Sequence, residues 1–112
     1  MQGYAPDIKP PTNMPLEIVW RRTAQRDLYE LYDWIAERAD PDAAFAWTSA
    51  IEQHVAKLSD FPDRGSPRED IAPGVRTLNY RGRTVIAYLT GERVEILRVF
   101  HAGRELGLGD WE

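Results

Sequence analysis

Residues 73–104 read PGVRTLNYRGRTVIAYLTGERVEILRVFHAGR, and the rest of the chain is organised around this segment. Segments rich in β-branched and aromatic residues alternate here with short turns that contain glycine, which adopts the positive φ of tight hairpins. The segments are 75–80, 84–89 and 93–101, and the turns are Arg81-Gly82-Arg83 and Thr90-Gly91-Glu92. The pattern predicts a three-stranded antiparallel meander.

The last of these segments is predicted to be a central strand. Strict alternation gives two faces, one with Val94, Ile96, Arg98 and Phe100, the other with Arg93, Glu95, Leu97, Val99 and His101. Both faces become apolar toward the C-terminal end of the segment, so neighbours should cover this strand on both sides.

The chain of 112 residues fits a single domain that buries one core without a metal or a disulfide. The absence of cysteine excludes a thiol nucleophile and thiolate metal sites, and agrees with a reducing cytoplasm. The longest apolar run, residues 85–89, is far shorter than the about 20 residues that span a bilayer, and no secretory leader opens the chain. We expect a soluble cytoplasmic protein.

The formal net charge of −4 is distributed unevenly along the chain. Residues 76–104 hold six arginines and two glutamates, whereas residues 1–60 hold six basic and ten acidic side chains. The predicted sheet is therefore basic and the N-terminal half acidic. This division favours a partner that presents negative charge to one face, and it argues against nucleic acid wrapping the whole surface.

Residues 1–15 hold four of the eight prolines and show no periodicity, so we expect an extension outside the core or, alternatively, an arm that docks on a neighbour. In residues 16–20, apolar and other side chains alternate, which predicts an edge strand. Residues 61–74 form a proline- and glycine-rich loop, either an ordinary connection or a mobile target-binding loop.

Two amphipathic helices are predicted between these segments, over residues 23–38 and 41–60. Thr23 and Asp40 are the candidate N-caps, and Pro62 ends the second helix. The apolar stripes are Ala24, Leu28, Leu31, Tyr32 and Ile35 in the first helix and Ala44, Trp47, Ile51, Val55 and Leu58 in the second. The short link makes an antiparallel helical hairpin, and the fold class is α+β, with this hairpin packed on a mainly antiparallel β-sheet.

Three sequence motifs occur in this order: DLYELYDWIAER (27–38), FPDRGSP (61–67) and EILRVFHAGREL (95–106). With them, residues 16–106 resemble the ParE branch of the RelE/ParE superfamily, the toxins of bacterial type II toxin–antitoxin modules. The resemblance implies one toxin domain over residues 16–112. It also implies a cognate antitoxin, ParD-like or similar, with a DNA-binding N-terminal part and an acidic C-terminal tail.

The two branches of the superfamily suggest two functions. ParE-type toxins inhibit DNA gyrase by binding, without catalysis, in modules that stabilise plasmids, whereas RelE-type toxins cut messenger RNA on the ribosome without a metal. By resemblance to the RelE branch, Arg76, Arg83 and Arg104 could stabilise the cleaved phosphate, with His101 as acid or base. The tyrosine that the RelE branch has beyond the last strand is missing, because only Trp111 is aromatic there.

Each candidate also has a structural interpretation. His101 can be a hydrogen-bonded residue at a strand end, Arg98 a half-buried paired cation, and the other arginines solvated charges. His54 and His101 are the only histidines, and the nucleotide, dinucleotide and serine-hydrolase motifs are absent, so we expect neither metal nor cofactor.

Overall acidity opposes docking among ribosomal phosphates. We therefore expect a gyrase inhibitor without catalytic residues, and the RNase is the second hypothesis. A third is an interaction module without toxicity. Target or antitoxin binding is assigned to Arg76, Arg83, Arg98 and Arg104, with no membrane and no sequence-specific nucleic-acid contact expected.

Overall fold

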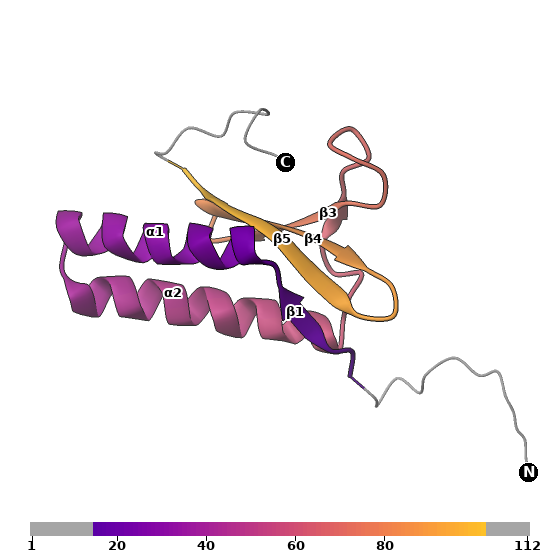
Figure 1. Ribbon diagram of the computed structural model, residues 1–112, viewed down its shortest axis with the longest axis horizontal. Coiled ribbons are helices and arrows are strands. Elements are labelled where there is room, and N and C mark those ends of the chain that lie inside the picture. The colour runs from indigo at the N-terminus through magenta and orange to yellow at the C-terminus, as the bar shows by residue number, and fades with distance from the viewer. Residues whose placement is uncertain (1–14, 103–112) are drawn as a thin grey trace, which may run out of the picture.

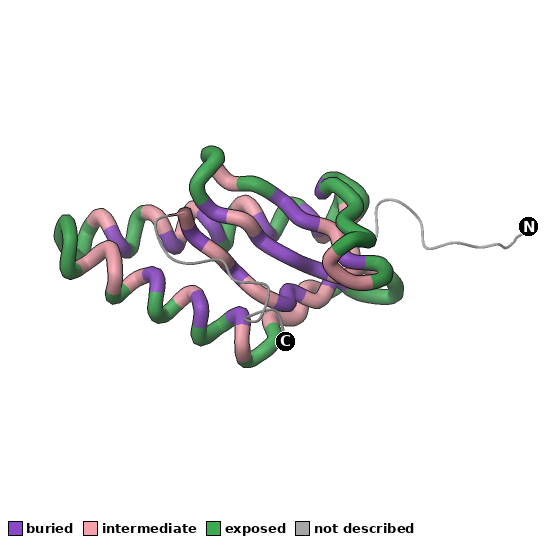
Figure 2. The backbone as a smooth tube through the Cα atoms, turned by 90° about the horizontal axis from the view of Figure 1, so that it is seen from above, coloured by how far each residue is buried: buried purple, intermediate pink, exposed green. Residues whose placement is uncertain are grey.

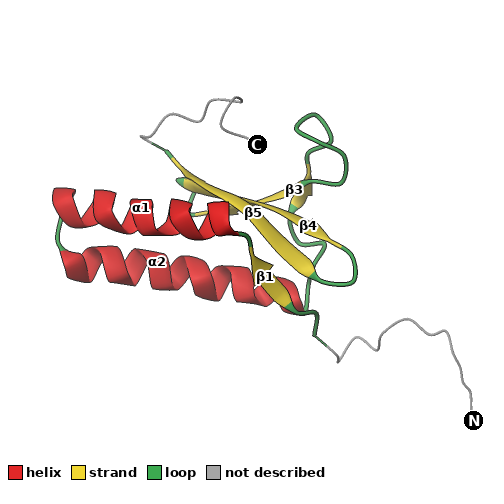
Figure 3. Cartoon of the chain, in the orientation of Figure 1, coloured by secondary structure: helices red, strands yellow, loops and turns green. Residues whose placement is uncertain are grey.

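The computed structural model describes residues 15–102, which form two layers, a helical hairpin and a sheet that it covers on one face (Figure 1). The elements are β1 (Ile18–Trp20), α1 (Arg22–Arg38), α2 (Pro41–Ala56), a short 3-10 helix η1 (Lys57–Ser59), β2 (Ser66–Pro67), β3 (Arg76–Tyr80), β4 (Thr84–Thr90) and β5 (Val94–His101). The predicted α+β class, the hairpin and the meander are confirmed (Figure 3). The predicted extension, apart from Pro15, lies outside the described residues.

Within the described residues, the sheet has the strand order β1-β5-β4-β3-β2. The edge position of β1 and the interior position of β5 are confirmed. β1 runs parallel to β5, with Ile18 opposite Val94, whereas all other pairs are antiparallel. The direction of β1 was not predictable from alternation, because only a short hairpin turn forces neighbouring strands to be antiparallel.

The predicted loop 61–74 contains a short strand that the sequence pattern missed. β2 pairs antiparallel with β3, with Ser66 opposite Thr77. Pro67 has no N–H to donate, and it is tolerated because β2 is the outermost strand. A run of two residues is too short for any alternation, so no periodic signal could mark it.

The helical stripes bury the core against the sheet (Figure 2). Side chains at most 1% exposed are Ala24, Leu31, Ala44, Ile51, Val55 and Leu58. Asp40 caps α2 as predicted, since its Oδ1 accepts from the Ala43 N–H at 2.7 Å. The predicted Thr23 cap is wrong: α1 already begins at Arg22, and the Thr23 hydroxyl donates to the Leu97 carbonyl at 3.1 Å.

A β-bulge in β5 overturns the predicted alternation of that strand. Opposite the neighbouring residues Ala87 and Tyr88, β5 has one residue too many, Leu97. Ile96 and Val99 both lie in the core under the helices, whereas Leu97 belongs to the apolar cluster on the other face. The predicted grouping of Val99 with Leu97 is wrong, because one inserted residue reverses the face of every residue that follows.

Candidate functional site

The sequence-predicted site residues do not converge on one point. Arg83 and His101 lie at one end of the meander, where the Ala102 N–H donates to the Arg83 carbonyl at 2.6 Å. Arg76 begins β3 at the other end, and four steps of about 3.3 Å separate it from Tyr80, the residue before the turn. Arg98 lies between the two ends, and Arg104 lies outside the described residues.

His101 is buried in an aromatic enclosure between the sheet and the two helices. The residue is 6% exposed, and its ring lies edge-on to Trp34 and Trp47, at centroid distances of 5.4 and 5.8 Å. Its Nδ1 is 2.8 Å from the Thr84 hydroxyl, which also accepts a hydrogen bond from the Trp47 Nε1–H at 3.2 Å. This burial favours the structural interpretation of His101, because an acid or base in RNA cleavage must reach the bound substrate.

Arg98 is held by a carboxylate of α1. Asp27 accepts from the Arg98 Nε at 2.7 Å and from an Nη at 3.1 Å, and the same carboxylate accepts from the Val99 N–H at 2.9 Å. The side chains of Arg98 and Asp27 are only 17% and 11% exposed. Arg98 was predicted to be important and Asp27 was not, although an aspartate beside the apolar stripe of α1 was an available signal.

Arg76 fixes the loop that precedes β2. Its guanidinium donates to the Gly65 and Asp63 carbonyls, both at 3.2 Å. Tyr88 reinforces this end, since its hydroxyl donates to the Pro62 carbonyl at 2.7 Å and accepts from the Gly65 N–H at 2.8 Å. A side chain at Gly65 would lie 2.7 Å from the Thr77 carbonyl, so glycine is required there. These contacts describe a fixed connection and lend no support to a mobile binding loop.

Burial raises the pKa of the Tyr88 phenol, because the ionised form loses solvation inside the fold. The hydroxyl therefore keeps the proton with which it bonds the loop. Like the Asp27 carboxylate, Tyr88 was not among the residues predicted to be important.

Arg83 differs from Arg76 and Arg98 in its surroundings. It is exposed, and no hydrogen bond or ion pair joins its guanidinium to another residue of the described range 15–102. Of the predicted binding cations that the structure describes, Arg83 is the one whose charge is not already used inside the fold.

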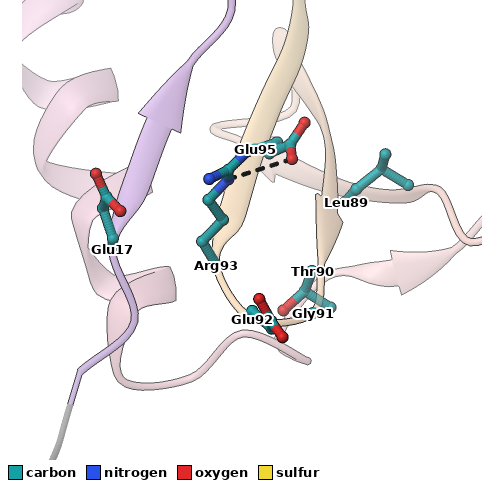
Figure 4. A pocket seen from close by; sticks show the side chains of 7 residues that line it. All are labelled: Glu17, Leu89, Thr90, Gly91, Glu92, Arg93 and Glu95. Carbon is teal, nitrogen blue, oxygen red and sulfur yellow. Dashed lines mark hydrogen bonds and ion pairs between the residues drawn. The ribbon is translucent and has the colours of Figure 1, made fainter.

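A pocket of about 530 Å³ lies at the β4–β5 turn, at the end of β5 opposite to His101 (Figure 4). Its charged residues are Glu17, Glu92, Arg93 and Glu95. Glu95 accepts from the Arg21 Nη at 2.7 Å and from the Arg93 Nε at 3.4 Å, and the bond from Arg21 lowers the pKa of its carboxyl. Three carboxylates make this pocket unsuited to RNA phosphate.

Two further pockets are lined by the loop 60–64, about 630 Å³, and by a group around Trp20, Leu28 and Glu52, about 250 Å³. Within residues 15–102, no three His, Asp or Glu side chains form a group that could hold a metal ion. No helix in this part of the chain has the length and apolarity needed to cross a membrane.

Comparison with known proteins identifies the family. Residues 18–106 match the family described as the ParE toxin of type II toxin–antitoxin systems, parDE. Toxin ParE3 of Caulobacter vibrioides is 33% identical over 73% of this chain and 82% of its own length, and toxin ParE1 of the same organism is 29% identical over 71% and 82%. The chain belongs to the ParE toxin family.

Solved structures agree with this assignment. The chromosomal ParDE toxin–antitoxin system from P. aeruginosa contains a chain with TM-score 0.69 and 27% identity, covering 80% of this chain and 98% of that one. The toxin–antitoxin complex RelBE2 from Mycobacterium tuberculosis contains a chain with TM-score 0.56 and 28% identity, covering 78% and 98%. A RelE/ParE-type toxin with a cognate antitoxin as partner is thus the protein class that sequence and fold define.

Proposed function

We propose that this toxin inhibits DNA gyrase by binding and performs no catalysis of its own. The burial of His101 beneath Trp34 and Trp47 is the observation that carries the proposal. Without this histidine at the surface, the residues assigned to RNA cleavage that the structure describes are reduced to Arg83 at one end of the meander and Arg76, already bonded to carbonyls, at the other. The ParE relatives support the same choice.

The test measures the activity of the toxin on two targets, DNA gyrase and the translating ribosome. Purified toxin with gyrase and plasmid should accumulate cleaved DNA or reduce supercoiling, while translating ribosomes incubated with the toxin should keep their messenger intact. Arg104→Ala should weaken the gyrase effect, and His101→Gln, chosen to keep a hydrogen-bonding side chain, should change it little in a variant that remains folded. Codon-dependent messenger cleavage that His101→Gln abolishes, with gyrase unaffected, would overturn the proposal.

Ribosome-dependent RNA cleavage is the second candidate. The likeness to the RelBE2 complex at 28% identity favours it, because that toxin carries the name of the other branch. Of the cations assigned to it, Arg83 is exposed and Arg104 lies outside the described residues, and the messenger assay above decides between the two activities.

The cognate antitoxin is proposed to be ParD-like, with an acidic tail that binds the basic sheet. The residues assigned to target or antitoxin binding are Arg76, Arg83, Arg98 and Arg104, and Arg83 is the described one among them whose charge is not already used inside the fold. A disordered tail that folds on binding can cover a large surface. Arg83→Glu is the cleanest test, because Arg76 and Arg98 also hold the fold together. It should weaken the complex at low salt, whereas Arg26→Glu, an equal charge change on exposed α1, should have little effect.

We propose that the toxin acts in the cytoplasm, because both proposed partners, DNA gyrase and the antitoxin, would be met there.

We also propose that residues 1–15 are an extension dispensable for folding. Deleting residues 1–13 should leave the midpoint of thermal unfolding within a few degrees of the full chain, and a larger drop would assign the segment to the core.

A further inference from the structure

The turn between β3 and β4, residues 80–83, contains a residue type that is unfavourable in the backbone conformation found there. Arg81 has φ 56°, and within residues 15–102 it alone among non-glycine residues has positive φ. Gly82 follows with φ 69°, and the Arg83 N–H donates to the Tyr80 carbonyl at 3.2 Å. This is the pattern of a type I′ turn, whose first central position prefers asparagine, aspartate or glycine. Arginine strains the backbone there, so the fold alone does not account for it.

Both arginines of the turn are exposed, and neither forms an ion pair within the described part of the chain. Residues 79–84 contain no carboxylate. In contrast, Arg21, Arg68, Arg93 and Arg98 each contact an acidic side chain. The turn therefore places two uncompensated guanidinium groups two residues apart at one end of the sheet.

Tyr80 supports one member of this pair, Arg81. The Arg81 guanidinium carbon lies 5.6 Å from the centre of the Tyr80 ring. That ring is held from α2 by Trp47 and His54, at centroid distances of 5.3 and 5.2 Å. A guanidinium over an aromatic face keeps its N–H groups available for a ligand while its position is restricted. Beside it, a side chain added at Gly82 would meet no atom within 4 Å, so the outer side of the turn is open.

From this geometry we infer that Arg81 and Arg83 bind phosphates of a double-stranded DNA backbone. The inference rests on the proposed function, in which gyrase presents DNA to the toxin. Planar guanidinium forks suit phosphate oxygens, and such contacts need no apolar groove. None of the three pockets described above includes a residue of 80–83, so an acidic tail that reaches Arg83 must find its apolar anchors elsewhere, whereas a phosphate needs no such anchor. DNA phosphate is therefore the partner that the turn fits.

The test uses the full chain, labelled with ¹⁵N and titrated with a 12-base-pair duplex of arbitrary sequence at low salt. Amides of residues 80–84 should shift, and the logarithm of the affinity should fall linearly with the logarithm of the salt concentration. Replacing both arginines, as Arg81→Asn with Arg83→Gln, should lower this slope by about 1.8, at about 0.9 per phosphate contact. The matched control, Arg22→Gln with Arg26→Gln, removes two exposed charges of α1 and should leave the slope nearly unchanged.

Arg81→Asn alone separates binding from folding. Because asparagine tolerates positive φ, this variant should unfold at a temperature equal to or higher than that of the wild-type protein and yet bind the duplex several-fold more weakly. No shifts at residues 80–84 in the wild-type protein, or equal affinities of the double variant and its control, would overturn the inference. Loss of antitoxin binding by the double variant with unchanged DNA binding would overturn it as well.

The gyrase assay separates this inference from the proposed function. If the wild-type toxin traps gyrase and the double variant does so equally well, the DNA contact is wrong and gyrase inhibition stands. If gyrase is unaffected by the wild-type toxin but the duplex shifts residues 80–84, the DNA contact stands and the proposed target is wrong.

Discussion

Arg98 and Arg83 carry the same side chain on the same sheet and differ in what surrounds it. Arg98 donates two hydrogen bonds to the Asp27 carboxylate of α1, whereas Arg83 is exposed at the β3–β4 turn. Arg76 resembles Arg98, because its guanidinium is bonded to two loop carbonyls. The basic charge counted along the meander therefore overstates the charge that a partner can contact, since part of it already stabilises the fold.

The largest effect should follow from Asp27→Ala, which leaves the Arg98 guanidinium and the Val99 N–H without this carboxylate. Removing one member of a buried ion pair costs about 3–5 kcal/mol, because the other charge stays desolvated. Urea unfolding at pH 7 measures the loss. The control is Asp33→Ala on the exposed side of the same helix, expected within about 0.5 kcal/mol of wild type. A loss below about 1 kcal/mol for Asp27→Ala would remove the distinction between the two arginines.

Tyr88→Phe should release the loop that Arg76 also holds. It leaves the Pro62 carbonyl and the buried Gly65 N–H without their bonds to the phenol, at a cost of about 2 kcal/mol.

The same variant has a signature in alkali. Because burial raises the pKa of Tyr88 above 10.0, the native state holds this proton more tightly than the unfolded chain does. The contribution is complete below pH 10 and is lost as the pH rises through the raised native pKa. Urea unfolding between pH 8 and 11, in steps of about half a unit, should show a steeper alkaline loss in wild type than in Tyr88→Phe. Parallel curves would refute this assignment.

A direct comparison of the two kinds of arginine uses one substitution at two places. Arg76→Met keeps the apolar stem but loses the bonds to Gly65 and Asp63, and should cost about 1 kcal/mol at this partly exposed site. Arg83→Met should stay within about 0.5 kcal/mol of wild type. Thermal unfolding of both variants side by side measures the difference. Equal losses would show that Arg83 also has a structural role.

The smallest effect on stability is expected from the exposed ion pair between Arg21 and Glu95, at the pocket beside the β4–β5 turn. Arg21 lowers the pKa of Glu95 below 4.5, so the native state binds this proton more weakly than the unfolded chain. The stabilisation is present above pH 4.5 and is lost as the pH falls through the lowered native pKa. Glu95→Gln should therefore differ slightly from wild type at pH 7, and the difference should vanish at low pH or in about 1 M salt. Glu92→Gln, which breaks no ion pair of the described residues, is the control.

Sequence reasoning succeeded where the signal was periodic or local. The two stripes placed the helices to within a few residues, the two glycine turns placed the meander, and Asp40 followed by proline marked the start of α2. It failed at Thr23, where the parallel pairing of β1 with β5 carries the chain directly from the sheet into α1. The Arg21 N–H donates to the Ile96 carbonyl, and α1 begins at the next residue, Arg22. Thr23 therefore lies inside the helix and cannot be its N-cap.

The class of fold, the family and the basic character of the meander could all be predicted from the sequence, because these depend on order, periodicity and residue type. Which of the basic and titratable side chains remain accessible depends on how the elements pack, and no sequence pattern predicted it. One extra residue, Leu97, reverses the alternation of β5 and so places Val99 on the face that the helices cover. Contacts between Arg98 and Asp27, separated by 71 positions, depend on that packing and leave no local pattern in the chain.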